Sequence, residues 1–65
     1  MKLTINGEMK EIRAATVADA LAALDFGDAR VATALNGRFV PQEARPDTEL
    51  SPGDTLEILS PMQGG

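Results

Sequence analysis

The chain has 65 residues, of which ten are acidic and six basic, so its formal charge is −4. This length allows one small domain, too small to favour a self-sufficient metabolic enzyme. The acidity argues against nucleic acid as a partner, because nucleic-acid binders carry basic patches. The sequence has no cysteine and no histidine, which excludes disulfides, thiolate nucleophiles and the commonest general base and metal ligand. We therefore expect no catalytic residues and no metal site.

No apolar run approaches the roughly 20 residues that a membrane-spanning helix needs. The first residues, Met1-Lys2-Leu3-Thr4, lack the apolar core of a signal peptide. We expect a cytoplasmic protein without a membrane partner.

The first 13 residues predict a β-hairpin. Residues 1–5 alternate apolar and polar side chains, which is typical of a strand with one wet face. Asn6-Gly7 is a strong hairpin signal, because a type I′ turn needs positive φ at both central residues. Residues 8–13 are expected to return as a second strand. Their alternation is poorer, since Met9 and Ile12 fall on opposite faces, and a bulge or an edge position would explain it.

A helix is predicted to begin at Thr16, because Thr16 and Asp19 are spaced as in a capping box. Gly27 is expected to end it in a left-handed conformation, which gives about nine to eleven residues, too few to be stable alone. The apolar residues that share one helical face are Val17, Ala20, Leu21 and Leu24. We expect this face to pack on the strands, against Leu3, Ile5 and Leu56.

The second half of the chain predicts three further strands. Residues 31–35 alternate, Asn36-Gly37 repeats the turn signal, and a short strand over 38–40 is ended by Pro41. An irregular connection or one helical turn is expected over 42–47, and Leu50 is its anchor. Residues 51–54 have the chemistry of a type II turn, and the last strand covers 55–59.

This order of elements predicts an α+β fold, in which a mixed sheet of four to five strands carries one main helix packed across one face. The domain is expected to span residues 1–60, followed by a flexible tail over 61–65 that ends in Gly-Gly.

The sequence of the C-terminal tail allows two interpretations. It can be a frayed end, as most domains have. It can also be a segment built for threading into another protein, because Gly64 and Gly65 have no Cβ and pass through channels closed to side chains. Met62 and Gln63 would be threaded with them, beyond the stiff Pro61. In that reading the α-carboxylate of Gly65 is the group best placed for covalent chemistry.

Phe39 and Met62 have no clear place in the alternation of the core. We expect both to be partly exposed and to form an apolar patch beside the exit of the tail, where a partner binds, with acids such as Glu57 near it. The alternatives are that Phe39 belongs to the core and that Met62 is an ordinary tail residue.

Three segments carry a resemblance to a known family: MKLTING at 1–7, ALNGRFVP at 34–41, and GD…I…PMQGG from 53 to 65. Together they resemble the ThiS family, the small sulfur carriers of thiamine biosynthesis. The resemblance covers essentially the whole chain and implies a ubiquitin-like β-grasp fold. The small subunit of molybdopterin synthase (MoaD) shares this fold and tail but is usually longer.

The resemblance also implies a reaction cycle. A ThiF-like, E1-like adenylyltransferase would use ATP to convert the Gly65 carboxylate into an acyl-adenylate. A sulfur donor protein would turn this into a thiocarboxylate, and a ThiG-like thiazole synthase would accept the sulfur. The carrier itself would bind no cofactor. Two alternatives stay open: a sulfur carrier for molybdopterin or tRNA thiolation, and a non-covalent β-grasp binding module.

Overall fold

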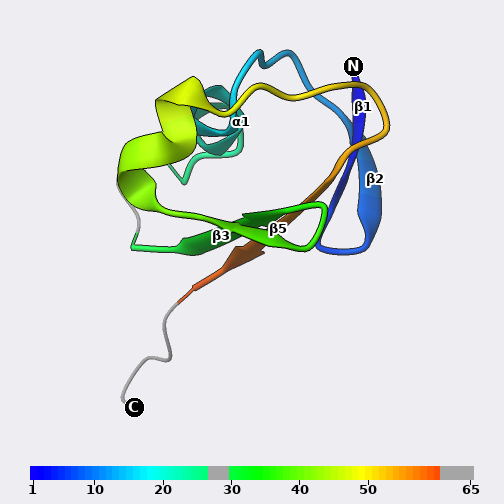
Figure 1. Cartoon of the computed structure of the whole chain (residues 1–65). Helices are drawn as coiled ribbons and strands as arrows, with labels where there is room; N and C mark the ends of the chain where they lie inside the picture. The colour runs from blue at the N-terminus through cyan, green and yellow to red at the C-terminus, as the bar shows by residue number, and fades with distance from the viewer. Residues whose placement is uncertain (27–29, 61–65) are drawn as a thin grey trace.

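The computed structural model describes residues 1–26 and 30–60, which form a mixed five-stranded sheet with an α-helix on one side (Figure 1). The strands lie in the order β2-β1-β5-β3-β4. β1 and β5 are parallel, and the other neighbours are antiparallel. The elements are β1 (Lys2–Ile5), β2 (Glu8–Glu11), α1 (Val17–Ala23), β3 (Ala32–Leu35), β4 (Arg38–Val40), the 3₁₀-helix η1 (Gln42–Asp47) and β5 (Thr55–Leu59). The predicted α+β architecture is confirmed.

Both predicted hairpin turns have the expected backbone. Asn6 and Gly7 have φ values of 51° and 86°, and Asn36 and Gly37 have values of 51° and 85°, as type I′ turns require. The strand after the first turn is shorter than predicted and ends at Glu11. Its register with β1 runs without interruption, so its edge position, and not a bulge, explains its poor alternation.

The start of α1 is the predicted one. The Thr16 hydroxyl accepts a hydrogen bond from the Asp19 backbone N–H at 3.2 Å. The Asp19 carboxylate accepts one from the Ala15 N–H, also at 3.2 Å. This reciprocal pair resembles a capping box shifted by one residue, and it satisfies two backbone donors that the helix itself leaves free.

The predicted helix end at Gly27 is wrong, because the seven-residue helix ends earlier, at Ala23. Asp25 takes the left-handed conformation, with φ of 69°. The N–H of Phe26 donates to the Leu21 carbonyl at 2.7 Å, and that of Asp25 donates to Ala22 at 3.2 Å, which is a Schellman motif. The early turn lets Phe26 pack back on the core. Gly27 itself lies outside the described residues.

The core lies between α1 and the sheet. The buried apolar cluster joins Leu3, Ile5, Val17, Ala20, Leu21, Leu50, Leu56 and Ile58. This confirms the predicted helical face, its strand partners and the anchor Leu50, although Leu24 is only partly buried.

The connection before β5 contains the predicted helical turn and the predicted tight turn. Arg45 of η1 reaches the edge of the core, where its Nε donates to the Thr33 hydroxyl at 3.3 Å. Thr33 is buried, and its hydroxyl donates in turn to the Val40 carbonyl at 2.8 Å. At the turn, Gly53 has φ of 89° and the Asp54 N–H donates to the Ser51 carbonyl at 3.1 Å. These bonds fix the direction in which the chain enters β5.

Replacing Leu21 by alanine tests the packing of α1. The side chain is 4% exposed, so we expect Leu21→Ala to lower the free energy of unfolding by roughly 2–5 kcal/mol. Leu59→Ala is the matched control, because Leu59 is exposed and surface changes usually cost about 0.5 kcal/mol or less. Urea denaturation measures both. A loss below about 1 kcal/mol for Leu21→Ala would contradict the packing described here.

Candidate functional site

The central strand β5 leads to the C-terminus, so its environment decides where the tail leaves the domain. On one side it pairs with β3 along most of its length, up to Leu59 opposite Ala32. On the other side its pairing with β1 stops at Leu56, opposite Ile5. The last residues of β5 therefore have a strand neighbour on one side only.

The side chain of Asn6 takes the place of the missing strand. Its Nδ2 donates to the Ile58 carbonyl at 2.9 Å, and its Oδ1 accepts from the Ile58 N–H at 2.7 Å. Asn36, at the same position of the other hairpin, accepts from the Thr55 N–H at 2.9 Å. Both turn asparagines thus hold β5. The sequence pattern predicts their place in the turns but gives no sign of this second role.

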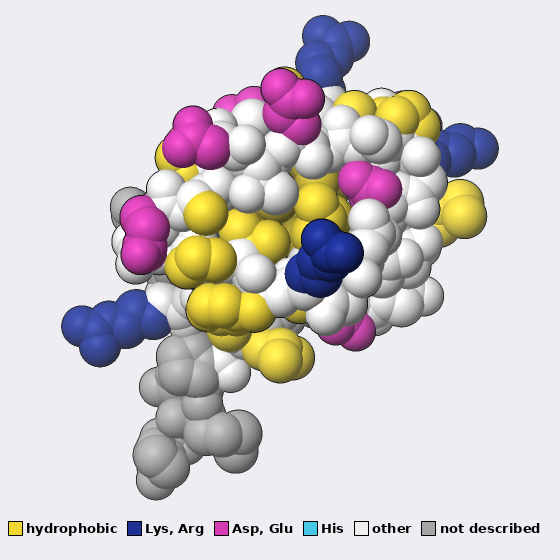
Figure 2. Space-filling model, in the orientation of Figure 1, with side chains coloured by type: hydrophobic (Ala, Val, Ile, Leu, Met, Phe, Trp, Pro, Cys, Tyr) yellow, Lys and Arg dark blue, Asp and Glu magenta, His cyan; other side chains and the backbone are white. Residues whose placement is uncertain are grey.

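An apolar surface lies on the side of the sheet that faces away from α1. Ala34 pairs with both Phe39 and Glu57, and these three residues share a face with Leu59, two positions beyond Glu57. Phe39 is 68% exposed and Leu59 is 66% exposed. We call Phe39, Ala34 and Leu59 the outer patch. The space-filling view shows hydrophobic side chains reaching the place where the described chain ends (Figure 2).

The exposure of Phe39 agrees with the expectation, and Glu57 lies on the same face, two strands away across Ala34. Leu59 is not among the residues predicted for this surface, although the inward-facing Leu56 and Ile58 put it on the outer face by alternation. The other predicted site residues lie outside the described residues: Met62, Gln63, Gly64 and Gly65. So does the proposed tail as a whole.

Within residues 1–26 and 30–60, no three His, Cys, Asp or Glu side chains are grouped so that they could hold a metal ion. Among the same residues, no helix has the length and apolar character needed to cross a membrane.

Comparison with known proteins shows the family of the chain. The sequence model of the ThiS family matches residues 3–65. The chain belongs to the ThiS family. A search among curated proteins finds no match.

Two solved structures agree with the family match. A crystal structure of the thiamine biosynthesis protein ThiS from Geobacter metallireducens is 36% identical, with a TM-score of 0.83 and full coverage of both chains. A solution structure of a thiamine biosynthesis protein from the same organism is 35% identical, with a TM-score of 0.80, and covers all of this chain and 88% of the other. The ubiquitin-like β-grasp fold is thereby shown. ThiS proteins are small sulfur carriers and not catalysts.

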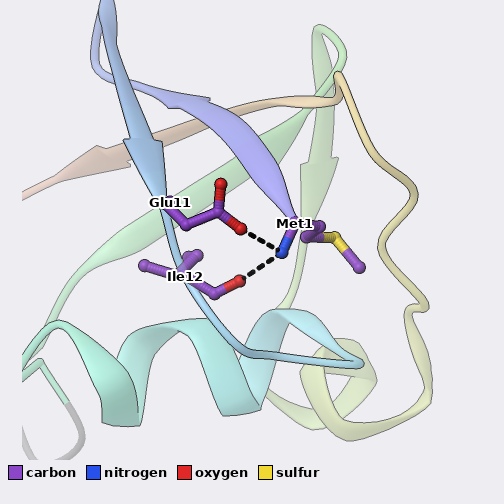
Figure 3. A network of polar contacts seen from close by, with 3 residues as sticks. All are labelled: Met1, Glu11 and Ile12. Atoms are coloured by element: carbon purple, nitrogen blue, oxygen red, sulfur yellow. Dashed lines mark hydrogen bonds and ion pairs between the residues drawn. The ribbon is translucent and has the colours of Figure 1, made fainter.

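One charged contact closes the open end of the β1–β2 hairpin in this ThiS-family chain (Figure 3). The Met1 ammonium group donates to the Ile12 carbonyl at 2.9 Å and lies 2.9 Å from a carboxylate oxygen of Glu11. The hydrogen bond from this ammonium group, with its positive charge, holds the pKa of the Glu11 carboxyl below its usual value. Lys2 lowers this pKa further by its charge.

This contact predicts a pH dependence at Glu11. When the pKa of a carboxyl is lower in the folded state than in the unfolded state, the contact stabilises the fold at pH values above the unfolded-state pKa of about 4.3. This stabilisation is lost as the pH falls through the folded-state pKa. We therefore expect Glu11→Gln to lower the melting temperature slightly at pH 7, because the contact is exposed. The difference should vanish in acid.

An NMR titration of the Glu11 side-chain carboxyl measures the pKa directly. A Glu11 midpoint at or above the ordinary value of about 4.3 would contradict the proposed cause.

Proposed function

We propose that this chain carries sulfur for thiazole formation in thiamine biosynthesis, with the Gly65 carboxylate as the attachment point. A ThiF-like adenylyltransferase forms the acyl-adenylate from ATP, a sulfur donor protein supplies the sulfur, and a ThiG-like thiazole synthase accepts it. The observation that carries the proposal is the family match, which extends to Gly65 itself and so includes the terminal Gly-Gly.

The chemistry explains why such a carrier needs no catalytic residue. A carboxylate is a poor acylating group, and adenylation gives it a phosphate leaving group. Attack by a sulfide-level sulfur atom on the acyl carbon then breaks the bond to the phosphate oxygen, releases AMP and leaves a thiocarboxylate, in which the nucleophilic sulfur stays attached to the protein. The partner binds the ATP, so the carrier needs no cofactor of its own. We place this cycle in the cytoplasm.

The tail must reach into the active sites of its partners. From Ser60 to Gly65 an extended chain spans up to about 20 Å. Gly64 can enter a channel of the partner that is too narrow for a Cβ atom, while Gln63 and Met62 occupy the wider approach to that channel. The asparagine contacts to β5 support this proposal, because they hold the chain only two residues before Ser60.

Deleting Gly65 tests the attachment point. The fold should be unchanged, since a chain end contributes few contacts. Sulfur transfer should stop, because the shortened chain places its carboxylate about 3.5 Å from where the ATP α-phosphate is attacked, and displacements of ~1 Å can already cost about 10²-fold in rate. The measurement is the intact mass after incubation with ATP, the adenylyltransferase and a sulfur source.

Two further variants separate the effect of tail length from the effect of side-chain size. Gly64→Val keeps the length but adds a β-branched side chain, and one residue added after Gly65 moves the carboxylate outward; both should block transfer. In the unchanged chain, the exchange of one carboxylate oxygen for sulfur should map to the C-terminal peptide. Full transfer by the Gly65 deletion would overturn the proposal in favour of a non-covalent binding module.

We also propose that the outer patch, with Met62, docks the activating enzyme. Phe39→Ala should weaken the productive encounter about ten-fold, as the loss of an aromatic anchor does, and should raise KM more than it lowers kcat. Met9→Ala is the matched control, because Met9 is 70% exposed but lies on β2. Equal adenylation kinetics for Phe39→Ala and Met9→Ala, with intact folds, would show that the patch is not the docking surface.

A further inference from the structure

The free edge of β2 has the features of a second binding surface. β2 is the outermost strand on its side of the sheet, and all four of its side chains are exposed. Met9, in its middle, is the most exposed large hydrophobic residue among those that the structure describes. The free backbone groups of an unpaired strand edge can pair with another strand, and the residues of β2 determine which strand fits.

The hydrogen bonds of the hairpin show which backbone groups of β2 point outward. Met1 and Ile12 exchange both backbone hydrogen bonds, each at 2.9 Å. Antiparallel pairs alternate between bonded and non-bonded residues, so in the continuous register Lys10 and Glu8 also bond to β1. The N–H and C=O groups of Met9 and Glu11 therefore face away from the sheet, and no strand within residues 1–26 and 30–60 pairs with them.

We propose that this edge pairs with the same edge of a second copy of the chain, antiparallel and centred on Met9. Only registers that join outward-facing residues are possible, and three lie near the middle of β2. Met9 opposite Gly7 places Glu8 against Glu8, and Met9 opposite Glu11 places Lys10 against Lys10. Met9 opposite Met9 places each Glu8 against Lys10 of the other copy. The charges thus select one register.

Both faces of this pairing are complementary. Glu8 and Lys10 lie on one face of β2, and their charged groups are 3.6 Å apart within one chain. In the dimer, each of these side chains pairs instead with the oppositely charged side chain of the other copy. On the other face the two Met9 side chains meet and bury apolar surface. The opposite edge strand fits less well, because β4 has three residues, is followed by Pro41 and has one charge, on Arg38.

The dimer leaves the proposed carrier function accessible. β5 is two strands away from β2, and the outer patch lies on β5, β3 and β4, so the contact between the two β2 edges covers none of these strands. A contact of one four-residue strand is small, and small interfaces are weak. We expect association at high micromolar concentration that is reduced by salt, because the two ion pairs are exposed.

A charge exchange tests the register on the full chain. Glu8→Lys and Lys10→Glu each place like charges opposite one another, so each variant alone should associate about ten-fold more weakly than the parent, or worse. The double variant Glu8→Lys/Lys10→Glu should regain association. Sedimentation equilibrium at low and high salt measures all four proteins, and circular dichroism confirms their folds.

A second experiment tests the backbone pairing and complements the charge variants. Met9→Pro removes an outward N–H that bonds to none of the residues that the structure describes, so the fold should survive as edge prolines do, while association should be lost. Phe39→Asp is the control and should leave association intact. A parent chain that stays monomeric at millimolar concentration in low salt would overturn the proposal. So would single charge variants that associate like the parent, or association that is lost in Phe39→Asp but kept in Met9→Pro.

Discussion

The backbone of β5 must find hydrogen-bond partners on both sides, and this constraint shapes the rest of the molecule. β1 can supply them only as far as Leu56, because the chain turns at Asn6 and Gly7 to form β2. An unpaired N–H and C=O at the buried Ile58 would cost about 1–3 kcal/mol each. The Asn6 amide meets both needs, since it carries one donor and one acceptor in a single plane.

Asparagine is suited to this position for two independent reasons. It tolerates the positive φ that a type I′ turn demands, and its amide copies the donor and acceptor pattern of a neighbouring strand. Aspartate would also tolerate the turn but could not donate to the Ile58 carbonyl at neutral pH. The repeated Asn-Gly turns thus form two hairpins and also hydrogen-bond to the central strand β5 from both sides.

The sequence predicted those features of the fold that depend on short-range patterns. Both Asn-Gly turns, the Thr16 cap and the apolar face of α1 follow from spacing within a few residues, and the structure confirms them. The helix end could not be placed in the same way. Asp25 is an uncommon left-handed residue, and it turns the chain because Phe26 has a place in the core. That place exists only once the sheet is assembled.

The same distinction applies to the site. The Gly-Gly end can be read directly from the sequence, as can the outward Phe39. The Asn6–Ile58 contact joins residues 52 positions apart, and no local pattern indicates it.

The two halves of the sheet differ in surface chemistry. The β5-β3-β4 half exposes Phe39 and Leu59 on the face away from α1. Such apolar exposure favours partners that bury it and release it again. The β2 half exposes alternating charges around Met9, which restrict an open edge to partners of matching charge and register. For the carrier function proposed above, both features matter: one surface accepts different partners, and one edge rejects all but a complementary strand.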